Sequence, residues 1–171
     1  MNQVLFFFAI AGWLLGLTAH LFSLADINVA AYIPFIWVLH VGIFVVWLPT
    51  IFALSKNKEL QAYQQSKKSG FGAFKIIFKH TPTWLMVLVI GSFIYAILNF
   101  ILFASSQIGT PEMQDGQYIL QNRGQFIKTI TEQEYHQYKA NELRGFSGHW
   151  LAFYGFAAAA LFPFNKKAKE E

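Results

Sequence analysis

The stretch TEQEYHQYKANELRGFSGHW at residues 131–150 decides the fold, because a polar segment with helix signals runs directly into an apolar one. Thr131 and Glu134 form a capping box, in which each side chain accepts a hydrogen bond from the other residue's amide. We therefore expect a short polar helix to begin here. Gly145 predicts its end, since glycine adopts the left-handed conformation without a Cβ clash and Arg144 complements the carbonyl end of the helix dipole.

A second helix is expected to start directly after Gly145 and to enter a membrane. Ser147 can cap it, and Trp150 and Tyr154 suit the boundary between water and lipid headgroups. The apolar run that follows carries no formal charge apart from a possible imidazolium at His149.

Composition places the whole chain in a bilayer. Its residues are 55% hydrophobic, 18% aromatic and only 13% charged, outside the range of soluble domains. An apolar core of about 30 Å needs about 20 helical residues. Four segments qualify, at residues 4–24, 32–54, 84–103 and 146–164. The sequence thus predicts a single integral membrane domain, an all-α membrane protein built as a four-transmembrane-helix bundle.

The basic residues gather on one side of the predicted bundle. Connection 55–83 holds six lysines against one acid, and the tail adds three lysines, which makes nine of the thirteen basic residues. Connection 104–145 balances four basic residues against five acids. By the positive-inside rule both termini and the 55–83 connection are cytoplasmic. Position along the chain therefore explains the basic charge, and we expect no nucleic acid partner.

Two connections carry further structure. Residues 55–83 predict an amphipathic stretch under the inner leaflet, and Pro34 is expected in the first turn of the second span. In 104–145, apolar runs flank Asn122-Arg123-Gly124, where Gly124 supplies the positive φ of a hairpin turn. Residues 105–116 are expected as a flexible entry. A β-hairpin and the capped helix would then form a small cap on the outer side.

Small and polar residues mark the faces that should meet protein. Gly12 and Gly16 have the spacing that lets a neighbouring helix approach closely, either within the chain or across a homodimer seam. Tyr95 and Asn99 lie one turn apart on an otherwise apolar helix. Because an unpaired amide in hydrocarbon costs several kcal/mol, we expect this polar face to point into the bundle.

Three histidines, His20, His40 and His149, lie in the outer halves of their spans, and imidazoles on facing helices can hold a b-type haem or a metal. The alternative is that they are hydrogen-bonded packing or interface residues. With no carboxylate in the hydrocarbon and no cysteine, we expect no metal and no resident cofactor, and keep haem b or a quinone as the alternative. The spans hold no acid, lysine or arginine, which argues against an ion-coupled carrier.

The cap offers a candidate interaction site. Its members are polar or aromatic residues of the predicted helix and the start of the fourth span: Glu134, Tyr138, Glu142, Arg144 and Trp150. They suit contact with lipid headgroups, a quinone or a partner. The alternative is that they only cap helix ends and sit at the headgroup level.

Residues 134–154 fit the pattern E-Y-x-x-Y-x-x-x-E-L-R-x-F-S-G-H-W-x-x-F-Y. In this pattern, and over about its last third, the chain resembles a group of small uncharacterised bacterial inner-membrane proteins. The resemblance implies a bacterial inner membrane. Together with the orientation expected from the lysines, this puts the cap in the periplasm. It transfers no catalytic residue.

The leading functional hypothesis is a non-enzymatic accessory or envelope-maintenance factor that acts through a membrane-protein partner, a second copy or lipid. The alternative is a membrane redox or lipid-modifying enzyme, with a haem, quinone or headgroup site at the periplasmic mouth near His20, His40 and His149.

Overall fold

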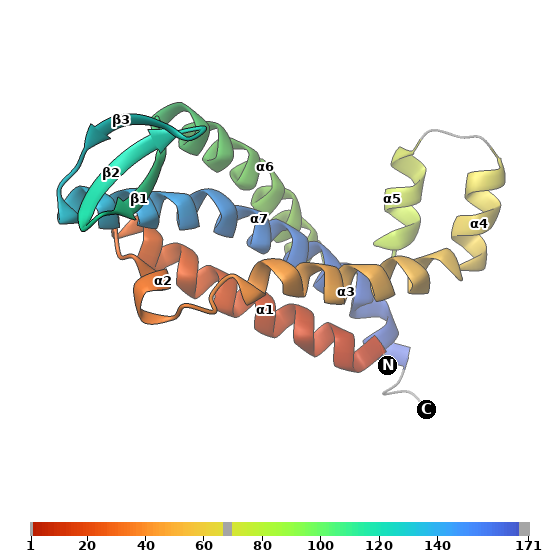
Figure 1. The fold of residues 1–171 in the computed structure, drawn as a ribbon. Coiled ribbons are helices and arrows are strands. Elements are labelled where there is room, and N and C mark those ends of the chain that lie inside the picture. The colour runs from red at the N-terminus through yellow and green to blue at the C-terminus, as the bar shows by residue number, and fades with distance from the viewer. Residues whose placement is uncertain (1, 67–69, 168–171) are drawn as a thin grey trace.

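The computed structural model describes the backbone of residues 2–66 and 70–167 and the side chains of 3–66 and 70–162. Among these residues, three helices are long and apolar enough to cross a membrane. They are α1 (Asn2–Leu24), α3 (Val38–Ser55) and α6 (Thr83–Ser106). A fourth long helix, α7 (Glu132–Lys167), runs among them, and a small sheet lies at one end (Figure 1). Lys67, Lys68 and Lys169, which entered the orientation argument, lie outside the described residues.

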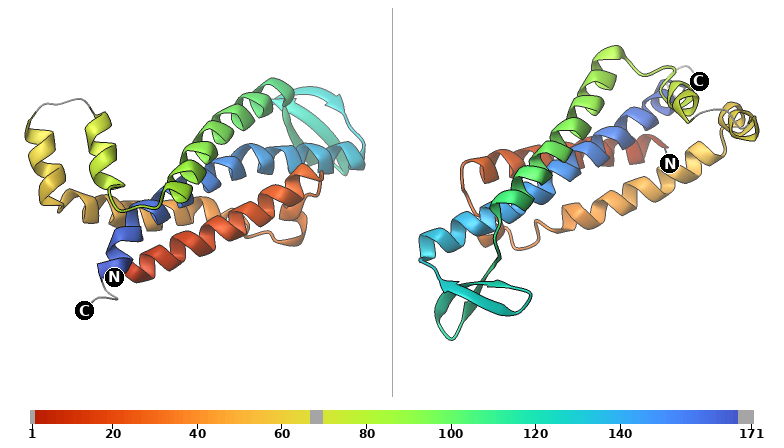
Figure 2. Two further views of the ribbon diagram at one scale, coloured as in Figure 1. Left: turned by 180° about the vertical axis from the view of Figure 1, so that it is seen from behind. Right: turned by 90° about the horizontal axis from the view of Figure 1, so that it is seen from above.

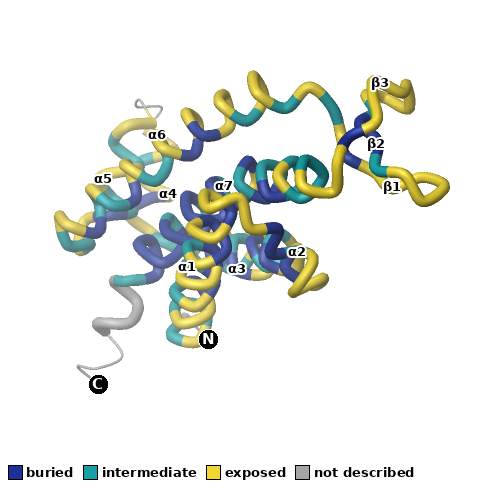
Figure 3. The backbone as a smooth tube through the Cα atoms, turned by 90° about the vertical axis from the view of Figure 1, so that its left-hand side faces the viewer, coloured by how far each residue is buried: buried dark blue, intermediate teal, exposed yellow. Residues whose placement is uncertain are grey.

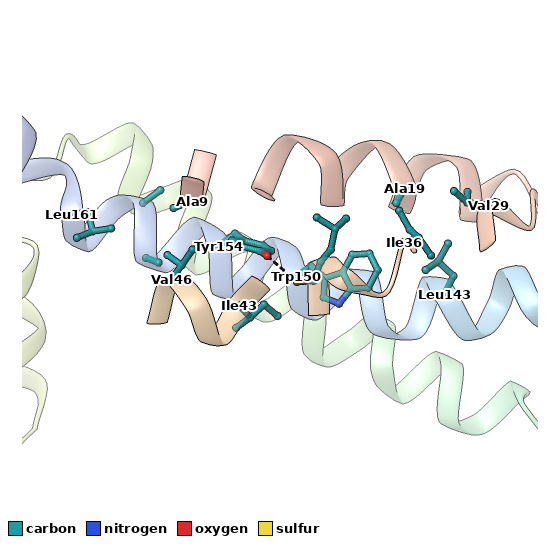
Figure 4. Packing of buried hydrophobic residues seen from close by; sticks show 13 residues of the cluster. Ala9, Ala19, Val29, Ile36, Ile43, Val46, Leu143, Trp150, Tyr154 and Leu161 are labelled. Atoms are coloured by element: carbon teal, nitrogen blue, oxygen red, sulfur yellow. Dashed lines mark hydrogen bonds between the residues drawn. The ribbon is translucent and has the colours of Figure 1, made fainter. Parts of the chain in front are cut away.

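Helix α7 is the centre of the bundle. Helices α1, α3 and α6 all pack against it (Figure 2), and its residues Trp150, Tyr154, Ala157 and Leu161 belong to the buried core (Figure 4). Each residue from Ala157 to Leu161 is at most 1% exposed. Small side chains let neighbouring helices approach, and a helix enclosed by protein needs less apolar surface than one facing lipid. The predicted segment 146–164 lies within this enclosed helix, and the count of four spans stays a prediction.

The capping box is confirmed, but the predicted break after it is wrong. The Thr131 hydroxyl accepts from the Glu134 amide at 3.1 Å, and the Thr131 amide donates to Glu134 Oε2 at 2.8 Å. Helix α7 then continues through Gly145 and Ser147 without a stop or a new cap. A Cβ on Gly145 would lie 2.6 Å from Cγ of Phe103, so this glycine serves the close approach of α6 and α7.

The second predicted span begins later than expected. A short helix, α2, spans Val29–Tyr32, and α3 starts only at Val38. Pro34 therefore lies in the connecting turn and not in the first turn of a span. The residue before a proline is disfavoured in the helical region, and Ile33 adopts ψ 82°.

The connection 55–83 forms two short helices, α4 (Lys58–Gln65) and α5 (Phe71–Ile77), which stand side by side and project from the bundle (Figure 1). Phe74 of α5 keeps contact with Phe156 of α7. Asn57 caps α4 by accepting from the Leu60 amide at 3.1 Å. Lys79, two residues after α5, and Glu59 of α4 form an exposed ion pair at 3.2 Å.

The sheet has three antiparallel strands in the order β1 (Thr110–Gln114), β2 (Gln117–Asn122), β3 (Gln125–Thr129). The predicted hairpin is confirmed as β2 and β3, and Gly124 has φ +79°. The expectation of a flexible entry at 105–116 is wrong in part, because β1 pairs with β2. Asp115 and Gly116, both at positive φ, make the turn between them.

Strands β1 and β2 pack against the first part of α7. Pro111 of β1 and Leu120 of β2 face each other in the register and are fully buried, as is Ala140 of α7. We call this unit, the sheet with residues 132–145 of α7, the cap. Figure 3 shows that β3 remains exposed along its length.

Candidate functional site

A chain of polar side chains joins α1, α6 and α7 near the cap end of the bundle. His20, which is 2% exposed, has both ring nitrogens engaged. Its Nδ1 lies 2.7 Å from the Ser147 hydroxyl and its Nε2 lies 2.5 Å from the Tyr95 hydroxyl. One imidazole thus links three helices.

The direction of these hydrogen bonds follows from their last member. The Ser147 hydroxyl donates to the Arg144 carbonyl at 3.3 Å, and a carbonyl only accepts. Ser147 must therefore accept from His20 Nδ1–H, and His20 Nε2 must accept from the Tyr95 hydroxyl. The tautomer of His20 is assigned by this network.

Asn99 reaches the same carbonyl from α6. Its side-chain amide donates to the Arg144 oxygen at 2.8 Å, and the side chain is 6% exposed. A Cβ on Gly148 would lie 2.8 Å from Asn99 Nδ2, so glycine there makes the approach possible. The polar face predicted for α6 points inward at Asn99, while Tyr95 remains 39% exposed.

A cavity of about 410 Å³ is lined by residues of α3, α6 and α7. Aromatic and aliphatic side chains make up most of its lining, with two histidines among them. The lining residues are His40, Ile43, Phe44, Trp47, Leu48 and Ile51 of α3, Phe100 of α6, and Phe146, His149 and Phe153 of α7. The α3 members recur at positions i, i+3, i+4, i+7, i+8 and i+11 from His40, so the sequence places them on one face of that helix.

His40 is fixed in one tautomer by Trp150. The indole Nε1–H donates to His40 Nδ1 at 3.2 Å. Because an indole nitrogen can only donate, Nδ1 must carry a lone pair, and the proton of the neutral ring is on Nε2. In this arrangement His40 offers a hydrogen-bond donor at Nε2, and this nitrogen does not fit a haem iron or another metal.

His149 is fixed in the opposite tautomer. Its Nδ1 lies 3.1 Å from the carbonyl oxygen of Gly145, one helical turn earlier. A carbonyl only accepts, so Nδ1 carries the proton and Nε2 of the neutral ring has the lone pair. The ring lies edge-on to Phe100, with centroids 5.2 Å apart.

The structure therefore brings two of the three predicted histidines to one cavity. His40 and His149 line it, whereas His20 belongs to the polar chain and has no free ring nitrogen. Within the described residues no group of three or more potential metal ligands is found.

The predicted cap residues have separate duties. Glu134 is held in the capping box, and hydrogen bonds from the Thr131 amide and hydroxyl lower the pKa of its carboxyl, with Lys128 adding to the effect. Glu142 pairs with Lys139 at 3.1 Å.

The remaining members of the predicted cap site also lie apart. Arg144 donates to the Asn141 side chain, which donates to the Gln107 side chain at 2.6 Å. Tyr138 is partly buried in the cap helix. Trp150 is 0% exposed, packed in the bundle against His40, and takes no part in a cap surface.

The small residues of α1 meet large ones of α7. A Cβ on Gly12 would collide with the Tyr154 ring, and one on Gly16 would lie 3.4 Å from Cβ of Trp150. The close approach thus occurs within the chain.

Sequence reasoning missed the partners that fix these side chains. Ser147, expected to cap a helix, instead accepts a hydrogen bond from His20. The contact between Trp150 and His40 spans 110 positions and has no local signal. Asn99 had been expected to need a partner, and the structure supplies the Arg144 carbonyl.

Comparisons of the chain with protein-family models, with curated proteins and with solved structures give no match.

Proposed function

We propose that this chain is a four-span protein of a bacterial inner membrane, with both termini in the cytoplasm and the cap in the periplasm, and that it acts without catalysis as an accessory or envelope-maintenance factor. Its cap docks a partner protein. The fourth span in this proposal is the enclosed half of α7, whose alanines suit contact with protein. The lysine-rich 55–83 connection supports the orientation.

The observation that carries the docking function is the exposure of β3. All five of its residues are exposed, with Phe126 at 63% and Ile127 at 41%. The register pairs Phe126 with Gln121 and Lys128 with Leu120, which leaves Ile127 as an extra residue in a bulge. Bulges redirect side chains, which explains how two successive apolar residues are both exposed. The ring of Phe126 in particular is left mostly uncovered by the fold.

The occupant that fits this surface is an extended polypeptide segment. Strand β3 stands at the edge of the sheet, so one side of its backbone has no strand partner among the described residues. Free N–H and C=O groups can be satisfied by an added strand, and apolar side chains can fill contacts alongside. A lipid chain offers no such groups.

Site-specific photo-crosslinking in native membranes tests this proposal. A benzophenone amino acid at Phe126 should give a protein adduct of one discrete mass. The same group at Gln137, an exposed residue of the cap helix, serves as the matched control and should give none. Lipid adducts at Phe126, or equal adducts at both positions, would contradict docking through β3.

A second candidate function, a membrane redox or lipid-modifying enzyme, is favoured by the cavity that His40 and His149 line. Alanine substitution of His20, His40 and His149 separates the two functions. Loss of function with intact folding and intact partner capture would support the enzyme, whereas loss of partner capture alone after Phe126→Ser would support docking.

A further inference from the structure

The cavity between α3 and α6 has the shape of a site for an elongated molecule. Its α3 lining runs from His40 to Ile51 along one helix face, a distance of about 16 Å at about 1.5 Å per residue. The volume of about 410 Å³ falls within the range of small-molecule sites. Phe44, Leu48 and Ile51 are each about half exposed, so the cavity opens at the side of the bundle.

Polarity is confined to one end of this cavity. His40 lies near the start of α3, the end of that helix nearer the cap, and His149 lies at the middle of α7, four residues beyond the cap. From Ile43 to Ile51 the α3 lining is wholly aliphatic or aromatic. An occupant should therefore have a polar head towards the cap and an apolar tail along the span.

The two histidines offer the head one donor and one acceptor. Trp150 leaves the proton of His40 on Nε2, and the Gly145 carbonyl leaves the lone pair of His149 on Nε2. Neither Nε2 has a hydrogen-bond partner among the described residues, and neither is a buried unsatisfied atom. Both nitrogens are accessible to an occupant.

The lining residues also disfavour some classes of polar head. None of the ten lining residues is an acid, lysine or arginine. A phosphate or carboxylate head placed there would lose its hydration without a compensating charge. A neutral head is favoured, and the faces and edges of Phe100, Phe146 and Trp47 suit a flat ring.

We propose that this cavity binds a prenylated quinone or hydroquinone, with the ring between His40 and His149 and the isoprenoid tail along α3. A quinone oxygen accepts from His40 Nε2–H, and a hydroquinone hydroxyl donates to His149 Nε2. The inference concerns binding alone and is independent of docking at the cap.

Binding of decylubiquinone and of its reduced form, decylubiquinol, to the purified chain in nanodiscs tests the proposal. Trp47, in the lining, provides a fluorescence signal for saturable quenching. His149→Leu should weaken the binding of decylubiquinol roughly tenfold, because it removes the acceptor for a hydroxyl. The binding of decylubiquinone should be weakened less. Phe52→Leu, at an exposed position of α3 outside the lining, is the matched control and should bind as the wild type does.

Leu48→Trp provides a second variant that fills the cavity and keeps both imidazoles. It should abolish saturable binding of both ligands. The proposal is overturned if Leu48→Trp binds as the wild type does, if palmitate displaces decylubiquinol at equal concentration, or if no saturable binding is found. Cross-linking at Phe126 reports on cap docking separately, so failure of one proposal leaves the other visible.

Discussion

The ring of Tyr154 fills the space that a side chain on Gly12 would need. The Tyr154 hydroxyl also donates to the Leu39 carbonyl at 2.8 Å (Figure 4). A Cβ on Gly42 would meet the same hydroxyl. One residue of α7 therefore sets the approach of α1 on one side and of α3 on the other.

Gly12→Ala should destabilise the bundle, because its methyl group collides with a ring that cannot move without losing its hydrogen bond. The expected loss is about 1–3 kcal/mol, the usual cost of overpacking. Gly16→Ala is the matched control, since its Cβ would be at 3.4 Å from Trp150. Free energies of unfolding from SDS titration in mixed micelles measure both, and equal losses would contradict the packing described.

Removing the hydrogen bonds of His20 should weaken the packing of α1 and α6 against α7. His20→Leu or Tyr95→Phe should each cost about 0.6–1.7 kcal/mol, the range of hydrogen bonds between membrane helices. Because the two residues share one hydrogen bond, the double variant should cost less than the sum. A double-mutant cycle on the unfolding free energy measures the coupling. Full additivity would show that the bond contributes nothing.

Gly145→Ala should also destabilise the chain by about 1–3 kcal/mol. The physical reason is the Phe103 ring, 2.6 Å from the position of the added Cβ. When Phe103 is already alanine, adding Gly145→Ala should lower the free energy of unfolding much less than it does in the wild type. Gly91→Ala, with no atom within 4 Å, should be neutral. If Gly145 instead acted as a helix stop, Phe103→Ala would not rescue it.

The capping box should make the stability of the protein depend on pH in the acid range. The folded Glu134 carboxyl has its pKa lowered below 4.5, first by the Thr131 amide and then by the Thr131 hydroxyl. Its contribution to stability is therefore present above pH 4.5 and is lost as the pH falls through the lower, folded value. NMR titration of the carboxyl should give this lowered pKa. Thr131→Val should raise the pKa part of the way, and by more than Lys128→Met. A larger effect of Lys128→Met would contradict the order of causes.

The orientation can be tested directly because the chain contains no cysteine. A single cysteine at Gln137, in the cap, should react with an impermeant maleimide in intact cells. One at Lys58, in α4, should react only after permeabilisation. The reverse pattern would refute both the positive-inside argument and the periplasmic cap.

Much of the fold could be predicted because its signals are local. The capping box needs only Thr131 and Glu134, and the β2–β3 turn needs only Arg123 and Gly124, both at positive φ. The turn at Asp115 and Gly116 carries an equally local signal, an Asp-Gly pair, which the sequence reasoning passed over. Hydropathy likewise identifies three of the helices without any knowledge of tertiary contacts.

The errors arose where a residue serves a distant partner. Gly145 looks like a helix end when read with its neighbours, and only Phe103, 42 positions earlier, shows why it is glycine. The three histidines could be placed in the outer halves of their spans. Their separation into a polar chain and a cavity depends on which way each helix is turned, and that is set by Ser147 and Trp150.

Helix α7 continues for 36 residues from the cap through the bundle, about 54 Å at about 1.5 Å per residue. It has no break at Gly145, where a joint had been expected. One continuous helix, packed along its sides against α1, α3 and α6, therefore joins the cap to the bundle. A pull on the cap would therefore change the tilt of α7 within the bundle.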